Sequence, residues 1–132
     1  MSSAALEEFY RAYIDCLNRQ DWSTLGQYVH GDVSHNTRRF GLNGYRAMLE
    51  NDFAQIPDLK FIIALMVCDE ARIAARLMFD CSPKGEFQGL PVNGRRVRFA
   101  EHVIYEMKDG KISQVWSMID VAAIAAQLQT RQ

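Results

Sequence analysis

Residues 95–120 read RRVRFAEHVIYEMKDGKISQVWSMID. Both halves of this stretch are rich in β-branched, aromatic and other apolar residues, and the turn dipeptide Asp109-Gly110 separates them. The pattern predicts a β-hairpin with strands at 95–108 and 111–120. The second strand ends on Asp120, although aspartate is among the residues least favoured in strands. The hairpin therefore indicates an antiparallel sheet and makes Asp120 the first candidate for a functional side chain.

Strand-like patterns extend upstream from this hairpin as far as Pro57. Segments 60–68 and 72–79 are rich in Ile, Val, Phe, Met and Leu, and the polar sequence DEA between them predicts a second hairpin. Residues 80–94 contain two prolines, two glycines and the turn dipeptide Asn93-Gly94, so we expect a long loop there with a short edge strand.

The N-terminal third has helical spacing instead. Apolar residues recur at steps of three and four within 6–17, with Ser3 as a candidate cap. Asp21 predicts the start of a second, shorter helix reaching Val29, and a third helix is expected from Asn43 until Pro57 ends it. Residues 32–41 predict a short strand and loop, and 121–129 predict a closing helix. Helices followed by antiparallel strands predict an α+β domain in which one sheet wraps the helices.

The composition limits the classes of partner. Lys and Arg number 15 against 16 Asp and Glu, so the net charge of -1 argues against nucleic acid or an anionic membrane as a partner. The longest apolar run, 61–68, is far shorter than the roughly 20 residues of a membrane span, and the N-terminus lacks a signal-peptide pattern. We expect a soluble, cytoplasmic protein with a single domain over 1–132.

The cysteine pattern argues against a metal site. Cys16, Cys68 and Cys81 are odd in number and contain no C-x-x-C pair, which indicates reduced core residues. We therefore expect no metal and no disulfide framework.

Two longer stretches carry a family resemblance. The sequences GEFQGLPVNGRRVRF (85–99) and KDGKISQVWSMIDVAAIAAQL (108–128) resemble the SnoaL-like family of polyketide and ester cyclases. That family lies within the superfamily of nuclear transport factor two, ketosteroid isomerases, limonene epoxide hydrolases and scytalone dehydratases. The likeness runs from DWSTL through GYRAML and IPDLKF to the C-terminal AQL, and the W-x-x-x-D after the D-G-K-I turn is its most specific part.

The resemblance implies a cone-shaped barrel. In such a barrel a curved, mostly antiparallel sheet wraps around about three N-terminal helices and encloses a hydrophobic pocket. It also implies a homodimer without a metal or organic cofactor. An aspartate at the position of Asp120 is the general acid/base of an intramolecular aldol closure in the cyclases that define the family. The histidine that those cyclases have before G-E-F is missing from DCSPKGEF (80–87), which argues against an aromatic polyketide substrate.

Three functions remain open from the sequence. The first is a cofactor-independent enzyme that closes a ring or shifts a proton in a small apolar carbonyl or ester compound, with Asp120 as acid/base. The second is epoxide hydrolysis or dehydration, which needs a carboxylate, an Asn and an Arg or Tyr around one water. The third is a domain that binds a small hydrophobic ligand without chemistry, because one fold supports many functions.

Asp120 has two interpretations. If it lies in the pocket against Trp116, Met118 and Phe99, burial would raise its pKa and let it exchange a proton near neutral pH. Alternatively, Asp120 only caps the helix at 121–129. This also explains why an aspartate stands at this position, because aspartate is a preferred N-cap.

The register of the final hairpin decides which residue faces Asp120. A two-residue turn would put Phe99 opposite Asp120 and Glu101 in the pocket. A three-residue loop would put Arg98 opposite Asp120 and His102 in the pocket opposite Trp116. We favour the second, because a histidine beside an acid makes a better proton-handling pair. The alternative for His102 is a partly exposed strand residue bonded to a neighbour.

Three further residues are candidates for substrate binding. His35 and Asn36 could polarise a substrate carbonyl, or they could form an ordinary turn in which Asn36 bonds its own backbone. Arg76 lies in an otherwise apolar strand and needs a partner. It could form an ion pair with Glu101 or Asp80, or it could hold a substrate carboxylate or ester.

Overall fold

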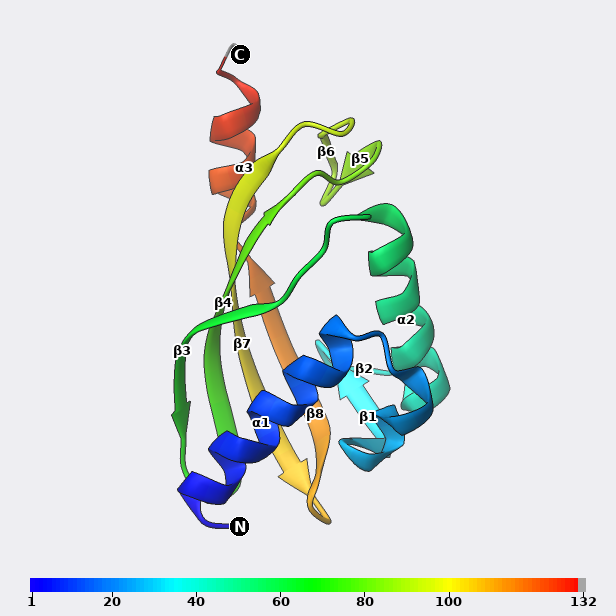
Figure 1. Ribbon diagram of the computed structural model, residues 1–132, viewed down its shortest axis with the longest axis vertical. Coiled ribbons are helices and arrows are strands. Elements are labelled where there is room, and N and C mark those ends of the chain that lie inside the picture. The colour runs from blue at the N-terminus through cyan, green and yellow to red at the C-terminus, as the bar shows by residue number, and fades with distance from the viewer. Residues whose placement is uncertain (131–132) are drawn as a thin grey trace.

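The computed structural model describes residues 1–130 and consists of a curved sheet wrapped around N-terminal helices (Figure 1). The elements in chain order are α1 (Ser3–Asn18), η1 (Trp22–Gln27), β1 (Val29–His35), β2 (Arg38–Arg39), α2 (Gly41–Gln55), β3 (Ile62–Cys68), β4 (Arg72–Cys81), β5 (Glu86–Phe87), β6 (Leu90–Pro91), β7 (Val97–Lys108), β8 (Lys111–Ile119) and α3 (Val121–Leu128). The main sheet has the order β2-β1-β8-β7-β4-β3, and β5 and β6 form a separate small hairpin. All neighbouring strands are antiparallel except β1 and β8. The predicted α+β class is confirmed.

Helix α1 lies across the concave side of the sheet, and α2 closes one flank (Figure 1). The apolar stripe of α1 is fully buried against the sheet, as its spacing predicts: Leu6, Tyr10, Tyr13, Ile14 and Leu17. Its cap is Ser2, whose hydroxyl accepts a hydrogen bond from the Ala5 amide at 3.1 Å, one residue before the predicted cap. Burial of this stripe joins the helix layer to the sheet in one core.

The second predicted helix is shorter than expected. It is a 3₁₀ helix that ends at Gln27, and Val29 already begins β1. Asp21 makes no side-chain cap, and Val29 is a β-branched residue that is buried in the strand. The predicted loop at 80–94 also contains a small hairpin, β5–β6, where a single edge strand was expected.

The final hairpin forms as predicted, but its register matches neither alternative. Asp109 and Gly110 make the two-residue turn, with φ of 53° and 73°, and Lys108 pairs with Lys111. A bulge then follows, because Met107 pairs with Ile112 whereas Glu106 pairs with Gln114, so Ser113 is the extra residue. In a regular ladder without the bulge, every later residue of β8 would point to the other face of the sheet.

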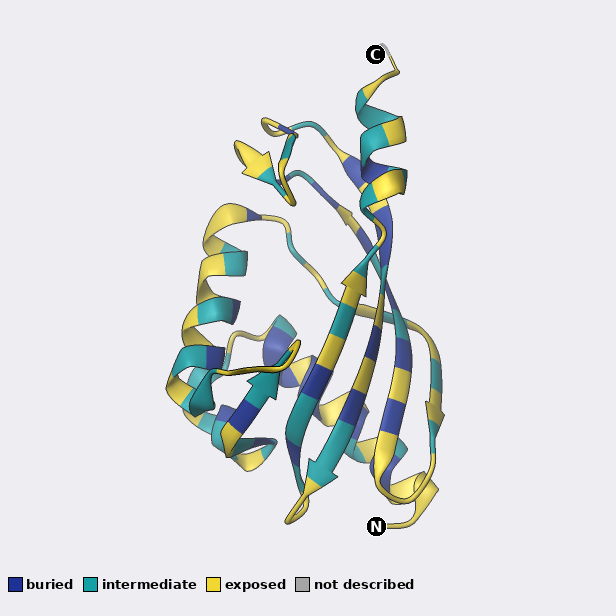
Figure 2. Ribbon diagram, turned by 180° about the vertical axis from the view of Figure 1, so that it is seen from behind, coloured by how far each residue is buried: buried dark blue, intermediate teal, exposed yellow. Residues whose placement is uncertain are grey.

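The two faces of the sheet differ as a result. Phe99 and Glu101 of β7 point to the concave face, together with Val115 of β8, whereas Trp116 and Met118 point outward. The outer face carries nearly all of the exposed large apolar side chains, and Figure 2 shows exposed and buried residues alternating along these strands. No helix within residues 1–130 has the length and apolarity needed to span a membrane.

Candidate functional site

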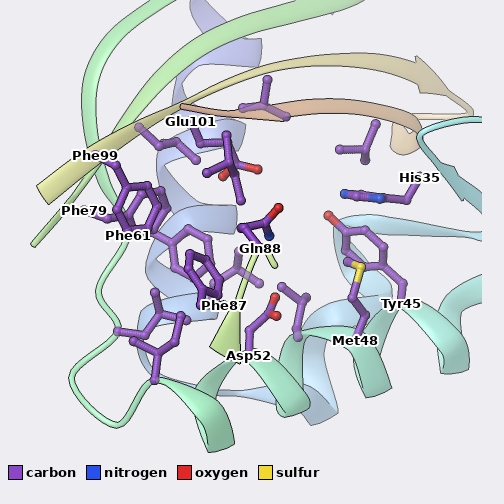
Figure 3. A pocket seen from close by; sticks show the side chains of 18 of the residues that line it. His35, Tyr45, Met48, Asp52, Phe61, Phe79, Phe87, Gln88, Phe99 and Glu101 are labelled. Atoms are coloured by element: carbon purple, nitrogen blue, oxygen red, sulfur yellow. The ribbon is translucent and has the colours of Figure 1, made fainter. Parts of the chain in front are cut away.

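The concave side of the sheet, α1, α2 and the β5–β6 turn line a cavity of about 280 Å³ that is partly open to solvent (Figure 3). Its lining is largely aromatic and aliphatic, with a few polar groups: His35, Tyr45, Asp52, Gln88 and Glu101. None of the lining residues, all within the described part of the chain, is Lys or Arg. A concave apolar site with a few converging polar groups is the usual form of a ligand site.

Glu101 extends from the middle of β7 into this cavity (Figure 3). The side chain is half-buried, because the cavity reaches it while protein surrounds it on the other sides. Burial raises the pKa of its carboxyl, and a hydrogen bond from the Ser117 hydroxyl to Glu101 Oε2 partly opposes this rise. The carboxyl can therefore exchange a proton closer to neutral pH than a free glutamate.

Asp52 enters the same cavity from α2. Burial raises its pKa from 3.8 to about 6, and the negative charge of Glu101 adds to the rise. In Figure 3 the two carboxylates face one another from opposite walls, with Gln88 between them in the view. Two acids in one cavity without a nearby cation disfavour simultaneous ionisation, so one tends to keep a proton.

His35 and Tyr45 form the opposite end of the cavity (Figure 3). Burial lowers the pKa of His35, which keeps its imidazole neutral, and its ring lies 6.3 Å from the Tyr45 ring centroid. The hydroxyls of Tyr13 and Tyr45 are hydrogen-bonded at 2.7 Å, and burial raises the pKa of both phenols well above the usual value. These groups are neutral polar contacts for a ligand.

A row of phenylalanines forms the remaining wall. Phe79 and Phe99 are stacked, with centroids 5.2 Å apart and planes 21° apart, and Phe87 lies 5.6 Å from Phe99. Phe61 packs edge-on against Phe79 at 5.3 Å. Phe99 and His35 line the cavity, and so does Glu101, which the sequence analysis placed there only in the less favoured register.

The expected cavity position of Asp120 is wrong. Its side chain is exposed and accepts a hydrogen bond from the Ala123 amide at 3.1 Å, which makes it the N-cap of α3. Trp116 and Met118 are also on the outer face, with 37% and 75% of their surfaces exposed. The physical reason is the bulge at Ser113, which rotates the end of β8 so that Ser117 and not Asp120 meets the cavity acid.

His102 and Arg76 also lie outside the cavity. They are cross-strand partners on the outer face, where an Arg76 guanidinium nitrogen lies 2.6 Å from His102 Nε2. The exposed-strand interpretation of His102 is therefore the correct one. The expected acidic partners of Arg76 are wrong, because Glu101 faces the other side and Asp80 pairs with Arg96 and Arg98.

Asn36 supports the site without lining it. Its side-chain oxygen accepts a hydrogen bond from the Ser117 amide at 2.7 Å, and its nitrogen donates to the Ser117 carbonyl at 3.2 Å. The amide thus acts as an extra strand residue that extends the β1–β8 pairing. The expected turn, in which the Asn36 side chain bonds its own backbone, is therefore replaced by bonds to the backbone of Ser117.

Asp52, Gln88, Tyr45 and Ser117 are site residues that the sequence analysis did not identify. Asp52 had a usable signal, because an acid within an amphipathic helix can fall on the buried side. Ser117 had none, since its position depends on a bulge that the residue pattern does not show.

The site gives no geometry for a metal. Within residues 1–130, no three His, Cys, Asp or Glu side chains are grouped so that they could hold an ion. All three cysteines are free.

The comparisons with known proteins agree with this architecture. The family model of SnoaL-like polyketide cyclases matches residues 7–128. A SnoaL-like polyketide cyclase from Agrobacterium tumefaciens is 53% identical, with 97% of this chain and 99% of that chain covered and a TM-score of 0.93. No curated protein matches the chain significantly.

Two more distant structures share the fold. TsrD from Streptomyces laurentii is 23% identical, with 98% of each chain covered and a TM-score of 0.83. IdmH from Streptomyces antibioticus is 19% identical, with 94% of this chain and 98% of that chain covered and a TM-score of 0.79. The family match over nearly all of the sequence, together with the 53% identical relative of the same fold, shows that this chain belongs to the SnoaL-like polyketide cyclase family.

Proposed function

We propose that this protein is a cofactor-independent acid/base enzyme that acts on a small apolar carbonyl or ester compound. The reaction is an intramolecular aldol cyclisation or a proton shift. The observation that carries the proposal is the position of Glu101, a carboxyl with a raised pKa inside an apolar cavity, with a second acid across from it. Pairs of acids with perturbed pKa values are typical of acid/base sites.

In this mechanism the Glu101 carboxylate removes a proton from the carbon next to the substrate carbonyl. The electron pair of the broken C–H bond forms an enolate, and its oxygen accepts a hydrogen bond from protonated Asp52, which keeps its proton. In a cyclisation the enolate carbon then attacks a second carbonyl of the same molecule, and the new alkoxide takes the proton from Glu101. In a proton shift, Glu101 returns the proton to a different carbon.

The test is proton exchange at a model ketone. In D₂O, 1-tetralone is incubated with the protein, and loss of the proton signal next to the carbonyl is followed by NMR. Glu101→Gln keeps the size of the side chain but cannot take a proton, so we expect about a hundredfold to ten-thousandfold slower exchange. Asp120→Asn is the control and is expected to leave the rate unchanged. Equal rates for Glu101→Gln and the wild-type protein would contradict the mechanism. Binding without any exchange would favour a domain that only holds its ligand.

The epoxide hydrolase or dehydratase alternative receives less support. It needs a carboxylate, an Asn and an Arg or Tyr around one water, but the Asn36 amide is occupied by the Ser117 backbone and Arg76 is on the outer face. Tyr45 is present in the cavity, yet its hydroxyl is bonded to Tyr13.

We further propose that a second copy of this chain covers the outer face of the sheet. Large apolar side chains gather there, and several of them are more than half exposed: Leu65, Val67 and Met118. Ion pairs lie at both ends of this face, formed by Arg72 with Glu106 and by Asp80 with Arg96 and Arg98. Arg76 and His102 lie in one cross-strand row between Leu65 and Met118, so the face combines exposed apolar side chains with polar groups. Exposed apolar side chains that gather on one face commonly mark a protein interface.

A further inference from the structure

We propose that Asn36 and Ser117 are positioning residues of the site and act in series: the Asn36 side chain fixes the backbone of Ser117, and the Ser117 hydroxyl fixes the carboxyl of Glu101. The role of Glu101 as a base rests on the proposed function. The chain of hydrogen bonds rests on the structure alone. It runs from the turn between β1 and β2, across β8, to the cavity acid on β7.

The backbone pairing of β1 with β8 ends two residues before Ser117. Its last pair is His35 with Val115, and the backbone N–H of Asn36 then donates to the Val115 carbonyl at 2.8 Å. Asn36 and Thr37 both have the left-handed conformation, with φ of 47° and 70°, and they turn the chain into β2. The β1 backbone therefore leaves one side of Ser117 to be held by another group.

The Asn36 side chain takes this place. Its oxygen accepts from the Ser117 N–H at 2.7 Å and its nitrogen donates to the Ser117 carbonyl at 3.2 Å, so one carboxamide bonds both backbone groups of one residue. A residue of an antiparallel strand bonds its partner in the same way. On its other side Ser117 pairs with Val103 of β7. The end of β8 is thus held from both sides.

Ser117 in turn holds the carboxyl of Glu101. Since Val103 pairs with Ser117 and Ile119 pairs with Glu101, the two side chains are diagonal neighbours on the concave face of the sheet. The Ser117 hydroxyl donates to Glu101 Oε2. The last torsion of a glutamate side chain has a broad distribution, so this hydrogen bond selects one orientation of the carboxyl plane. A base that is already oriented removes a proton faster than one that must first be aligned.

The same hydrogen bond favours the charged form of Glu101, which lowers its pKa against the effect of burial. Asp52 is the acid that titrates in a similar range, with a pKa of about 6, so the test must follow Glu101 itself and not the total charge of the site. Burial keeps the phenols and the imidazole around Glu101 uncharged near neutral pH. These groups are Tyr10 and Tyr13 of α1, His35 of β1, Tyr45 of α2 and Tyr105 of β7.

The experiment follows the Glu101 carboxyl by NMR in protein labelled with ¹³C at glutamate Cδ, and Glu101→Gln identifies its signal. Ser117→Ala removes the hydrogen bond to the charged form, so the midpoint of the Glu101 titration should move to higher pH. Ser117→Thr keeps a hydroxyl and should restore the wild-type midpoint. Ser34→Ala changes a serine of β1 that does not line the cavity, and it is the control that should leave the midpoint unchanged.

Asn36→Gly tests the first step of the series. It removes the carboxamide, and glycine accepts the left-handed conformation of the turn. We expect a shift of the Glu101 midpoint in the same direction as in Ser117→Ala, and no further shift when the two substitutions are combined. An unchanged midpoint in Ser117→Ala would overturn the proposal. So would a shift from Asn36→Gly that is equally large with and without the Ser117 hydroxyl.

Proton exchange at 1-tetralone separates this inference from the proposed function. In Ser117→Ala the plateau rate at high pH should fall about tenfold, because the carboxyl is no longer held in one orientation. The affinity for 1-tetralone should change little, since Ser117 does not line the cavity. If the Glu101 midpoints move as expected but the wild-type protein exchanges no proton, the proposed function fails and the hydrogen-bond chain stands. If exchange depends on Glu101 but not on Ser117, this inference alone fails.

Discussion

At the scale of single residues, the cavity contains two acids, and none of its lining residues within the described part of the chain is Lys or Arg. Glu101 and Asp52 both have raised pKa values because burial disfavours their charged forms, and a hydrogen bond from the Ser117 hydroxyl favours the charged form of Glu101. Such an arrangement costs stability whenever the acids ionise. The cost is the expected consequence of keeping proton-transfer groups in an apolar site.

Asp52→Asn should stabilise the protein in a pH-dependent way. The pKa of about 6 in the folded state lies above the unfolded value near 4, so the folded state binds more protons within that window. Stability therefore falls as pH rises from about 4 to 6, and the full cost of up to about 3 kcal/mol is present above pH 6. Removing the acid should raise the melting temperature by several degrees at pH 8 and change it little at pH 4.

Thermal unfolding across this pH range provides the measurement. Glu8→Gln, an exposed acid on α1, is the matched control and should show no such trend. An equal effect of Asp52→Asn at pH 4 and pH 8 would contradict the assignment of the raised pKa.

The sequence predicted part of the site at this scale. Glu101, Phe99 and His35 lie in the cavity, because alternate residues of a strand point to the same face of the sheet. His102 was misplaced, since the alternation along a strand does not reveal which of its two faces is concave, and Asp120 was misplaced because of the bulge in β8. Gln88 and Tyr45 reach the cavity from a turn and a helix, and their placement depends on packing that no local pattern encodes.

At the scale of elements, the bulge in β8 decides the chemistry of the site. The turn at Asp109-Gly110 was predictable, because its dipeptide suits the left-handed conformation that both residues adopt. The bulge at Ser113 was not, because serine in a strand has no distinctive signature. Because of this one extra residue, Ser117 and not Asp120 lies next to Glu101.

Asp120→Ala should act on helix α3 and not on catalysis. The substitution removes the hydrogen bond from the Ala123 amide, and loss of such an N-cap costs about 1 kcal/mol. We expect a lower melting temperature with an unchanged proton-exchange rate per folded molecule. Asp120→Ser, which retains a capping oxygen, should recover most of the stability. If the Asp120→Ala variant were as stable as the wild-type protein but exchanged protons much more slowly, Asp120 would instead take part in catalysis.

At the scale of the whole molecule, α1 lies across the concave side of the sheet, and the outer side carries most of the exposed large apolar side chains of residues 1–130. The class of fold and the order of the elements followed from the sequence, because the change from helical to strand periods at Pro57 is sharp. The parallel pairing of β1 with β8 did not follow, since it joins segments about eighty residues apart. The proposed dimer is the simplest way to cover this outer side.

Val67→Lys should weaken self-association. The residue is 71% exposed on the outer face, so a lysine there costs little in the monomer but places an unpaired charge in the proposed interface. We expect at least a tenfold higher dissociation constant in analytical ultracentrifugation. Ala12→Lys adds the same charge to an exposed position of α1 and is expected to leave association unchanged. If the wild-type protein stayed monomeric at high concentration, this would contradict the proposed dimer.

The extra residue at Ser113 also affects how related chains are compared. A relative with the same spacing between its D-G turn and its terminal aspartate, but with a regular ladder, would present that aspartate to the cavity opposite Phe99. Two aligned sequences with identical letters at this position can thus place the carboxylate on opposite sides of one strand. Transferring a catalytic role between homologues by alignment column is therefore unsafe here until the hydrogen-bond ladder of each protein has been traced from its turn.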